Sequence, residues 1–323
     1  MTTTQEQADR FADAFTRVLG NVTSVIKGKR DEVGMVLVAL FAEGHVLLED
    51  VPGTGKTVLA KSIANSFGGD WSRVQFTPDL LPADVTGGLV YNQSRGSFDV
   101  HRGPVFANVV LADEINRASP KTQSALLQVM EERQVTIGDT THDVPRPFGV
   151  VATQNPIEQE GTYRLPEAQL DRFLMRMALG YPDHDHEVDV LRDAAAGVRP
   201  DSLNAVISTE QARQMIAVVN GIHLDDAMRS YVVRLCAATR ELSELRLGVS
   251  TRGALAIMRA ASSLAATQAR IYVNIDDVKA VAHAVMGHRL LLTPEAELRS
   301  VRTDDLVDRV LAQVEAPAAR RAA

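Results

Sequence analysis

The segment Asp50–Thr57 constrains the fold more than any other part of this 323-residue chain. It reads DVPGTGKT, follows the apolar run His45–Leu48, and precedes a helical pattern over Val58–Phe67. A strand, a glycine-rich turn and a helix in this order build a phosphate-binding loop, because backbone N–H groups and the helix N-terminus converge on one anion. The segment therefore predicts a P-loop fold of the α/β class, with a nucleotide at the start of the helix.

The residues of this loop have expected parts in binding. Lys56 would reach the β- and γ-phosphates, and Thr57 would offer its hydroxyl to Mg²⁺. Asp50 stands where such loops have their first glycine, but this position lies at the strand end, away from the phosphates, so we expect it to be tolerated. Gly53 and Gly55, next to the anion, are intact. The predicted nucleotide-binding residues are Val51, Pro52, Gly53, Thr54, Gly55, Lys56, Thr57 and Val58.

A second motif, Val109–Glu114, supplies the carboxylates that phosphate hydrolysis needs. It reads VVLADE and predicts a buried strand that ends in two acidic residues. Asp113 would hold the water shell of Mg²⁺, and Glu114 would polarise an attacking water molecule. Together the two motifs predict that the chain hydrolyses ATP with Mg²⁺. A glutamate directly after the aspartate favours a hydrolase over a kinase or a GTPase switch.

Composition narrows the class of partner. The net charge is −7 and no block of Lys or Arg occurs, which disfavours a nucleic-acid motor because such binding depends on basic clusters. The one cysteine, Cys236, permits no disulfide framework and suits a reducing cytoplasm. The first ten residues are polar and lack a signal peptide's apolar region, and Met35–Ala42 is far shorter than the ~20 residues that span a bilayer. We expect a cytoplasmic protein without a membrane segment.

Alternating strand and helix patterns in the first half predict a parallel sheet with helices on both faces and the ligand at the carboxyl ends of the strands. Two β-hairpins interrupt this alternation, near residues 89–101 and 134–144. From Thr209 onward the patterns are only helical. We predict an ATPase core over 1–180, a linker over 181–200, an all-helical lid over 201–314 and a frayed tail over 315–323.

Three further polar residues are candidates for the site. Asn155 follows a strand beside the Asp-Glu strand and would orient water or contact the γ-phosphate; an Asx turn before Pro156 is the alternative. Arg172 would stabilise transition-state charge in a neighbouring subunit, or would pair at the surface with Asp171. Arg252 would reach the nucleotide from the second domain, or would be an ordinary helix-start arginine.

The segment Asp183–Glu187, DHDHE, superficially suggests a metal site. It follows a proline and leads into a helical pattern, where acidic residues suit a helix N-terminus. His283 and His288 are five residues apart and do not share a helix face. We therefore expect no metal site at either place.

Three long blocks resemble the MoxR family of AAA+ ATPases: Ala112–Glu132, Val151–Pro156 and Gly161–Phe173. The resemblance covers about Val18 to Leu291. It implies an αβα ATPase core with a helical lid, assembled as a ring that is usually a hexamer. The two hairpins match the helix-2 insert and the pre-sensor-1 hairpin of that clade.

The resemblance also assigns residues and partners. It implies hydrolysis at subunit interfaces, a von Willebrand factor A-domain partner, and a client protein complex that is remodelled or matured. Arg164 departs from the family pattern, and Arg117 would face a neighbouring subunit. The implied positions are Walker A at Gly53, Gly55, Lys56 and Thr57, Walker B at Asp113 and Glu114, sensor 1 at Asn155, the arginine finger at Arg172 and sensor 2 at Arg252.

Other functions share the same core. A chelatase-type ATPase subunit is one alternative, and a nucleic-acid motor is another. The hairpins carry few basic residues for a motor: Arg95 and His101 in the first, Arg133 and His142 beside or in the second. A scaffold that binds nucleotide without turnover is countered by the intact Glu114.

Overall fold

The computed structural model describes residues 2–155, 162–197 and 203–317. The chain divides into two compact units. The core unit consists of Ala14–Phe173 and Met177–Gln214, and the C-terminal unit consists of Met1–Asp13, Leu174–Arg176 and Met215–Ala323.

These two units are defined by their compactness alone. The predicted domain bounds, with a core over 1–180, a linker over 181–200 and a lid over 201–314, stay a prediction. The predicted linker, 181–200, contains the helix α7 (His184–Ala195). Several positions named above lie outside the described residues: Pro156, Gly161, the end of the predicted linker (198–200), the start of the predicted lid (201–202) and the end of the tail (318–323).

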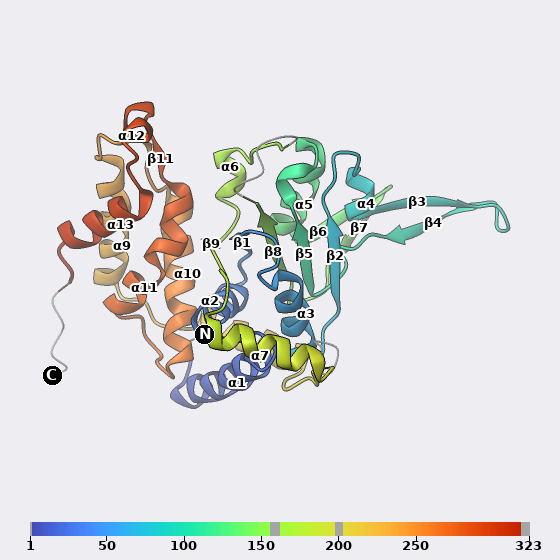
Figure 1. The fold of residues 1–323 in the computed structure, drawn as a ribbon, viewed down its shortest axis with the longest axis horizontal. Coiled ribbons are helices and arrows are strands. Elements are labelled where there is room, and N and C mark those ends of the chain that lie inside the picture. The colour runs from blue at the N-terminus through green and yellow to red at the C-terminus, as the bar shows by residue number, and fades with distance from the viewer. Residues whose placement is uncertain (1, 156–161, 198–202, 318–323) are drawn as a thin grey trace. The chain divides into compact units, whose positions relative to one another are not determined.

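The central sheet has the strand order β2-β5-β8-β1-β9, and β2, β5, β8 and β1 run parallel. All of β5 (VVLAD) is buried, and such an unbroken apolar run is typical of a parallel strand covered on both faces. Because these strands are parallel, their carboxyl ends meet at one edge, as Figure 1 shows. The bounds are β1 Val46–Glu49, β2 Trp71–Gln75, β5 Val109–Asp113, β8 Gly149–Gln154 and β9 Met175–Met177.

Helices cover this sheet: α3 packs against β2 and β5, and α2 packs against β1. A buried cluster joins the sheet to α5 and to the second hairpin through Leu47, Val110, Leu126, Ile137 and Phe173. Ser119 caps α5 by accepting from the Thr122 N–H. The helices up to the end of α7 are α1 Gln5–Thr23, α2 Arg30–Phe41, α3 Lys56–Ser66, α4 Pro82–Thr86, α5 Pro120–Glu132, α6 Glu167–Leu170 and α7.

Both hairpins form where the sequence predicts them. The first pairs β3 (Gly87–Asn92) with β4 (Ser97–Arg102), and the second pairs β6 (Gln134–Ile137) with β7 (Thr140–Asp143). The β3–β4 hairpin extends away from the central sheet (Figure 1). Gly96 has φ 61°, a left-handed conformation that glycine adopts without strain in the turn.

Within its described residues, the region predicted as an all-helical lid is helical apart from one short pair of strands. Leu245–Leu247 (β10) pairs antiparallel with Leu291–Leu292 (β11). These strands are too short for an alternating pattern to reveal them in the sequence. The helices are α8 Thr209–Asn220, α9 Asp226–Arg240, α10 Thr251–Thr267, α11 Ile275–Met286, α12 Pro294–Leu298 and α13 Thr303–Gln313.

Among the described residues, no helix combines the length and the apolar character that crossing a lipid bilayer requires.

Candidate nucleotide-binding and hydrolysis site

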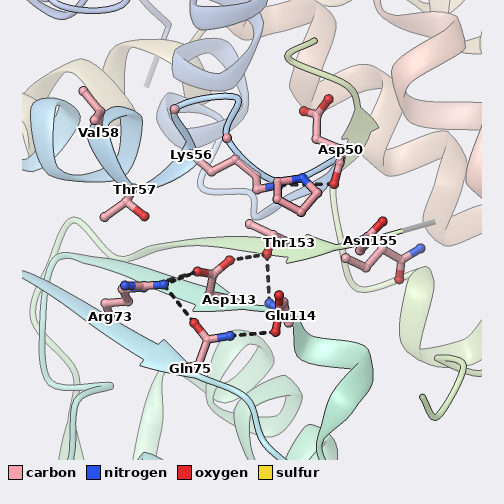
Figure 2. Close-up of a pocket in the computed structure, with 14 residues that line it drawn as sticks. Asp50, Lys56, Thr57, Val58, Arg73, Gln75, Asp113, Glu114, Thr153 and Asn155 are labelled. Atoms are coloured by element: carbon pink, nitrogen blue, oxygen red, sulfur yellow. Dashed lines mark hydrogen bonds and ion pairs between the residues drawn. The ribbon is translucent and has the colours of Figure 1, made fainter. Parts of the chain in front are cut away.

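A pocket of about 430 Å³ lies at the carboxyl edge of the parallel strands (Figure 2). It is bounded by the loop after β1, the start of α3 and the ends of β2, β5 and β8, where a parallel sheet is expected to bind its ligand. The lining residues are Asp50, Pro52, Gly53, Gly55, Lys56, Thr57, Val58, Arg73, Gln75, Asp113, Glu114, Thr153, Gln154 and Asn155.

The loop after β1 has the backbone conformation that its glycines predict. Gly53 has φ 89° and Gly55 has φ 85°, and Gly55 is the N-cap of α3. A Cβ at Gly53 would meet nothing within 4 Å, so the backbone angle, rather than lack of space, favours glycine there. The unpaired N–H groups and the positive dipole end at the start of α3 suit an anion.

Lys56 lies over its own loop. Its Nζ donates to the main-chain oxygens of Asp50 (3.2 Å) and Val51 (2.9 Å). Within the described part of the chain it has no carboxylate partner. Its charge is therefore not neutralised by another side chain, which suits a phosphate ligand.

Asp50 has a structural role that the sequence did not reveal. Its carboxylate accepts from the N–H groups of Leu179 (2.6 Å) and Gly180 (3.0 Å), and the residue is only 5% exposed. In Figure 2 this carboxylate points away from Lys56. The aspartate thus joins the first residue of the loop to the segment after β9, a contact that a glycine does not provide.

The two carboxylates at the end of β5 have different partners. Asp113 Oδ2 accepts from Arg73 Nη2 (2.7 Å) and Nε (3.2 Å), and Asp113 Oδ1 accepts from Thr153 Oγ1 (2.6 Å). Glu114 Oε2 accepts from Gln75 Nε2 (2.7 Å) and from Arg117 Nη1 (2.9 Å). A part for Arg117 at a neighbouring subunit stays a prediction.

Glu114 itself has a left-handed backbone, with φ 56°. Such a conformation is uncommon for a residue other than glycine and often occurs at functional sites. The Glu114 N–H donates to Thr153 Oγ1 (2.9 Å), so the end of β8 holds this turn. The positive φ re-aims the glutamate side chain relative to the strand that precedes it.

Sequence reasoning missed Arg73, Gln75 and Thr153. Thr153 ends an apolar strand pattern and lies within the block Val151–Pro156, but neither feature assigns a role to its hydroxyl. Arg73 and Gln75 alternate along β2, but they acquire meaning only when the pairing of β2 with β5 is known.

The other predicted site residues occupy different places. Asn155 lines the pocket directly after β8 and is 9% exposed. Arg172 is not among the lining residues: it pairs with Glu131 (3.0 Å) and donates to the Leu127 oxygen (2.7 Å) on α5, rather than pairing with Asp171. Arg252 lies in the first turn of α10 in the C-terminal unit, and its part at this pocket stays a prediction.

The donor set fits Mg²⁺ and a nucleotide. Thr57 and Asp113 offer hard oxygen ligands, and Mg²⁺ usually takes one or two such protein ligands together with phosphate oxygens and water. No group of three or more His, Cys, Asp or Glu side chains that could hold a metal ion occurs in the described ranges. The metal held here would neutralise phosphate charge.

Comparison with known proteins agrees with this geometry. The AAA family, "ATPase family associated with various cellular activities", matches residues 45–175, and the AAA lid domain matches residues 237–310. The chain is 45% identical to the uncharacterized protein YeaC of Bacillus subtilis, over 95% of this chain and 96% of that protein. It is 44% identical to chaperone MoxR1 of Mycobacterium tuberculosis, over 93% of this chain and 82% of that protein.

A third relative, protein MoxR of Paracoccus denitrificans, is 33% identical over 96% of this chain and 97% of its own length. The crystal structure of a candidate ATPase from Cytophaga hutchinsonii superposes with a TM-score of 0.90 at 38% identity, covering 96% of this chain and 97% of that one. With the P-loop, the paired carboxylates and the helical C-terminal region, these relatives show that the chain is an ATP hydrolase and belongs to the MoxR family of AAA+ ATPases.

Proposed function

We propose that this ATPase works in the cytoplasm as a homo-oligomeric ring. The family resemblance makes a hexamer the expected stoichiometry. It would hydrolyse ATP at interfaces between subunits and use the cycle to remodel or mature a client protein complex. The observation that carries the proposal is the convergence of Lys56, Thr57, Asp113 and Glu114 on one pocket, while Arg172 lies outside that pocket's lining.

Each group would have a separate task at the site. Lys56 and the N-terminus of α3 would bind the phosphates. Thr57 and Asp113 would hold Mg²⁺, whose charge adds to that of Lys56. Glu114 would polarise the attacking water, and Asn155 would orient it.

The predicted arginine finger is the part that requires a second subunit. In this chain Arg172 is held on α5 by Glu131 and the Leu127 oxygen, so the pocket of the same chain does not contain it. An arginine supplied by a neighbour stabilises transition-state charge and is worth roughly 10³–10⁵ in rate. A chain without a neighbour would then hydrolyse ATP slowly.

The β3–β4 hairpin is the surface we expect to contact a client. In its register Leu89 stands opposite Val100 and Tyr91 stands opposite Phe98, so these four apolar side chains share one face. All four are exposed, with Tyr91 at 54% and Phe98 at 64%. An exposed apolar face of this kind favours a protein client over nucleic acid.

The family resemblance adds a von Willebrand factor A-domain protein as the expected partner. The chelatase-type subunit and the nucleic-acid motor stay the alternatives. Neither is favoured by a particular contact in the described residues.

The interface mechanism is tested by mixing two inactive variants. Lys56→Ala removes the side chain that would bind the phosphates but keeps Arg172. Arg172→Ala keeps the pocket intact but removes the predicted arginine finger. If hydrolysis needs both subunits, each variant alone is inactive, and a 1:1 mixture recovers activity at about a quarter of the interfaces of a closed ring. Arg213→Ala, which removes an arginine from an exposed ion pair on α8, serves as the control.

Oligomer mass must be recorded on the same samples. Recovered turnover in assembled mixtures supports a site shared between subunits. Absence of recovery in mixtures that do assemble contradicts it.

A further inference from the structure

Arg73 and Gln75 connect the two carboxylates of the site through a closed ring of hydrogen bonds (Figure 2). The two residues are two positions apart on β2, and Gln75 stands opposite Asp113 in the β2–β5 register. Arg73 Nη2 donates to Asp113 Oδ2 (2.7 Å) and to Gln75 Oε1 (2.8 Å), and Gln75 Nε2 donates to Glu114 Oε2 (2.7 Å). Thr153 Oγ1 closes the ring by donating to Asp113 (2.6 Å) and accepting from the Glu114 N–H (2.9 Å).

The two members of the ion pair differ in their freedom to move. The Asp113 side chain is 12% exposed and also accepts from Thr153, whereas the Arg73 side chain is 46% exposed. Across the described ranges, Arg73 pairs with no carboxylate other than Asp113. The arginine is therefore the partner that can swing toward solvent while the carboxylate stays in place.

We propose that Arg73 is a resident cation that competes with Mg²⁺ for Asp113, and that it sets how strongly Mg²⁺ favours nucleotide binding. The proposal rests on the proposed nucleotide site, because it takes Asp113 as the residue that holds the metal. Arg73 is then a positioning residue of the ATPase site, one that the loop and the Asp-Glu motif do not include.

The competition follows from the hydrogen bonds and the charges. Both carboxylate oxygens of Asp113 already accept a hydrogen bond, Oδ2 from Arg73 and Oδ1 from Thr153. A divalent cation at this carboxylate would lie beside a guanidinium of the same sign, and like charges so close repel one another strongly in a partly buried site. Binding the metal at Asp113 therefore requires Arg73 to move away, which its half-exposed position permits.

Arg73 also matters when the metal is absent. Paired with Arg73, Asp113 presents a neutralised group to the phosphates of a nucleotide. Without Arg73, an uncompensated carboxylate would repel those phosphates in the absence of Mg²⁺ and would bind the metal more readily in its presence. Both effects act in the same direction: removing Arg73 increases the dependence of nucleotide affinity on Mg²⁺.

The test measures that dependence rather than turnover. Fluorescent mant-ADP is titrated with the full-length chain in EDTA and again in saturating Mg²⁺, and the ratio of the two dissociation constants is the readout. In Arg73→Met, which removes the charge and keeps the length, we expect this ratio to rise about tenfold, as for loss of one charge-assisted contact. Arg73→Lys keeps the positive charge but loses the fork of guanidinium donors, so its ratio should rise less than that of Arg73→Met, by about threefold or less.

Arg213→Met provides the matched control, because Arg213 is similarly exposed in an ion pair of the core unit but lies outside the pocket lining. Its ratio should equal that of the wild type. Circular dichroism and thermal unfolding show whether each variant is folded.

Two results would overturn the proposal. If Arg73→Met weakens mant-ADP equally with and without Mg²⁺, Arg73 contacts the nucleotide directly and does not compete with the metal. If Arg73→Lys matches Arg73→Met, the positive charge is not the cause. If the wild-type chain binds no mant-ADP in either condition, the assignment of the nucleotide site is itself wrong. This outcome differs from the first two, in which the wild type binds the nucleotide.

Discussion

Asp50 allows a sharp test of how the phosphate loop is held, because its buried carboxylate has two main-chain donors. The N–H groups of Leu179 and Gly180 donate to it at 2.6 and 3.0 Å. Hydrogen bonds to a charged group contribute about 1.5–3 kcal/mol each. Asp50→Ala leaves both N–H groups without this acceptor, so we expect local opening of the segment after β9 to become easier by roughly 3 kcal/mol or more.

Hydrogen–deuterium exchange measures this opening directly. In Asp50→Ala the amides of Leu179 and Gly180 should exchange on the order of 100-fold faster, while the strands of the central sheet keep their protection. Asp50→Gly, which restores the usual glycine of such loops, should loosen the segment just as much. The control is Asp139→Ala, which removes an exposed carboxylate from the β6–β7 turn. Unchanged exchange at residues 179 and 180 in both Asp50 variants would refute the reasoning and leave Asp50 as merely tolerated.

Two further predictions concern the C-terminal unit. Burial raises the pKa of the Cys236 thiol to about 11, so at pH 8 the folded chain should react with a thiol reagent more than about 100-fold slower than the urea-unfolded chain. The stability that this thiol contributes is complete below its ordinary pKa of 9.0 and is lost as the pH rises through about 11; reaction at equal rates would contradict the burial. Asp277 pairs with Arg270 at 2.5 Å with its side chain 2% exposed, so Asp277→Ala should lower the free energy of unfolding by about 3–5 kcal/mol in denaturant titrations. The neighbouring exposed Asp276→Ala should cost less than about 1 kcal/mol, and equal losses in the two variants would contradict the role of the pair.

The phosphate loop, the Asp-Glu strand and both hairpins could be predicted because their signals are local. Glycines at fixed offsets between an apolar run and a helical pattern specify the turn at Gly53 and Gly55 without any knowledge of distant residues. The hairpins follow from turn residues between short β-like runs. The order of strands in the sheet, in contrast, was not predicted, because it depends on pairing between segments that are distant in the sequence.

What the sequence could not provide depends on contacts between distant segments. Asp50 looked like a tolerated substitution, because its two donors lie about 130 residues further along the chain. Arg73 and Gln75 looked like ordinary strand residues until the β2–β5 register placed them beside Asp113 and Glu114. The short β10–β11 pair could not be predicted for a different reason. Strands of two or three residues are too short to show an alternating hydrophobic pattern.

We propose that Glu114 activates water for ATP hydrolysis in the pocket that Lys56 and Asp113 also line. The most direct measurement compares ATP binding and ATP turnover in Glu114→Gln with the wild type, using Glu132→Gln on α5 as the control. Because a positioned general base contributes about 10²–10⁴ in rate, we predict that Glu114→Gln binds ATP with an affinity close to that of the wild type but turns it over at least about 100-fold more slowly. Turnover at the wild-type rate in Glu114→Gln, with Glu132→Gln also unchanged, would contradict the account.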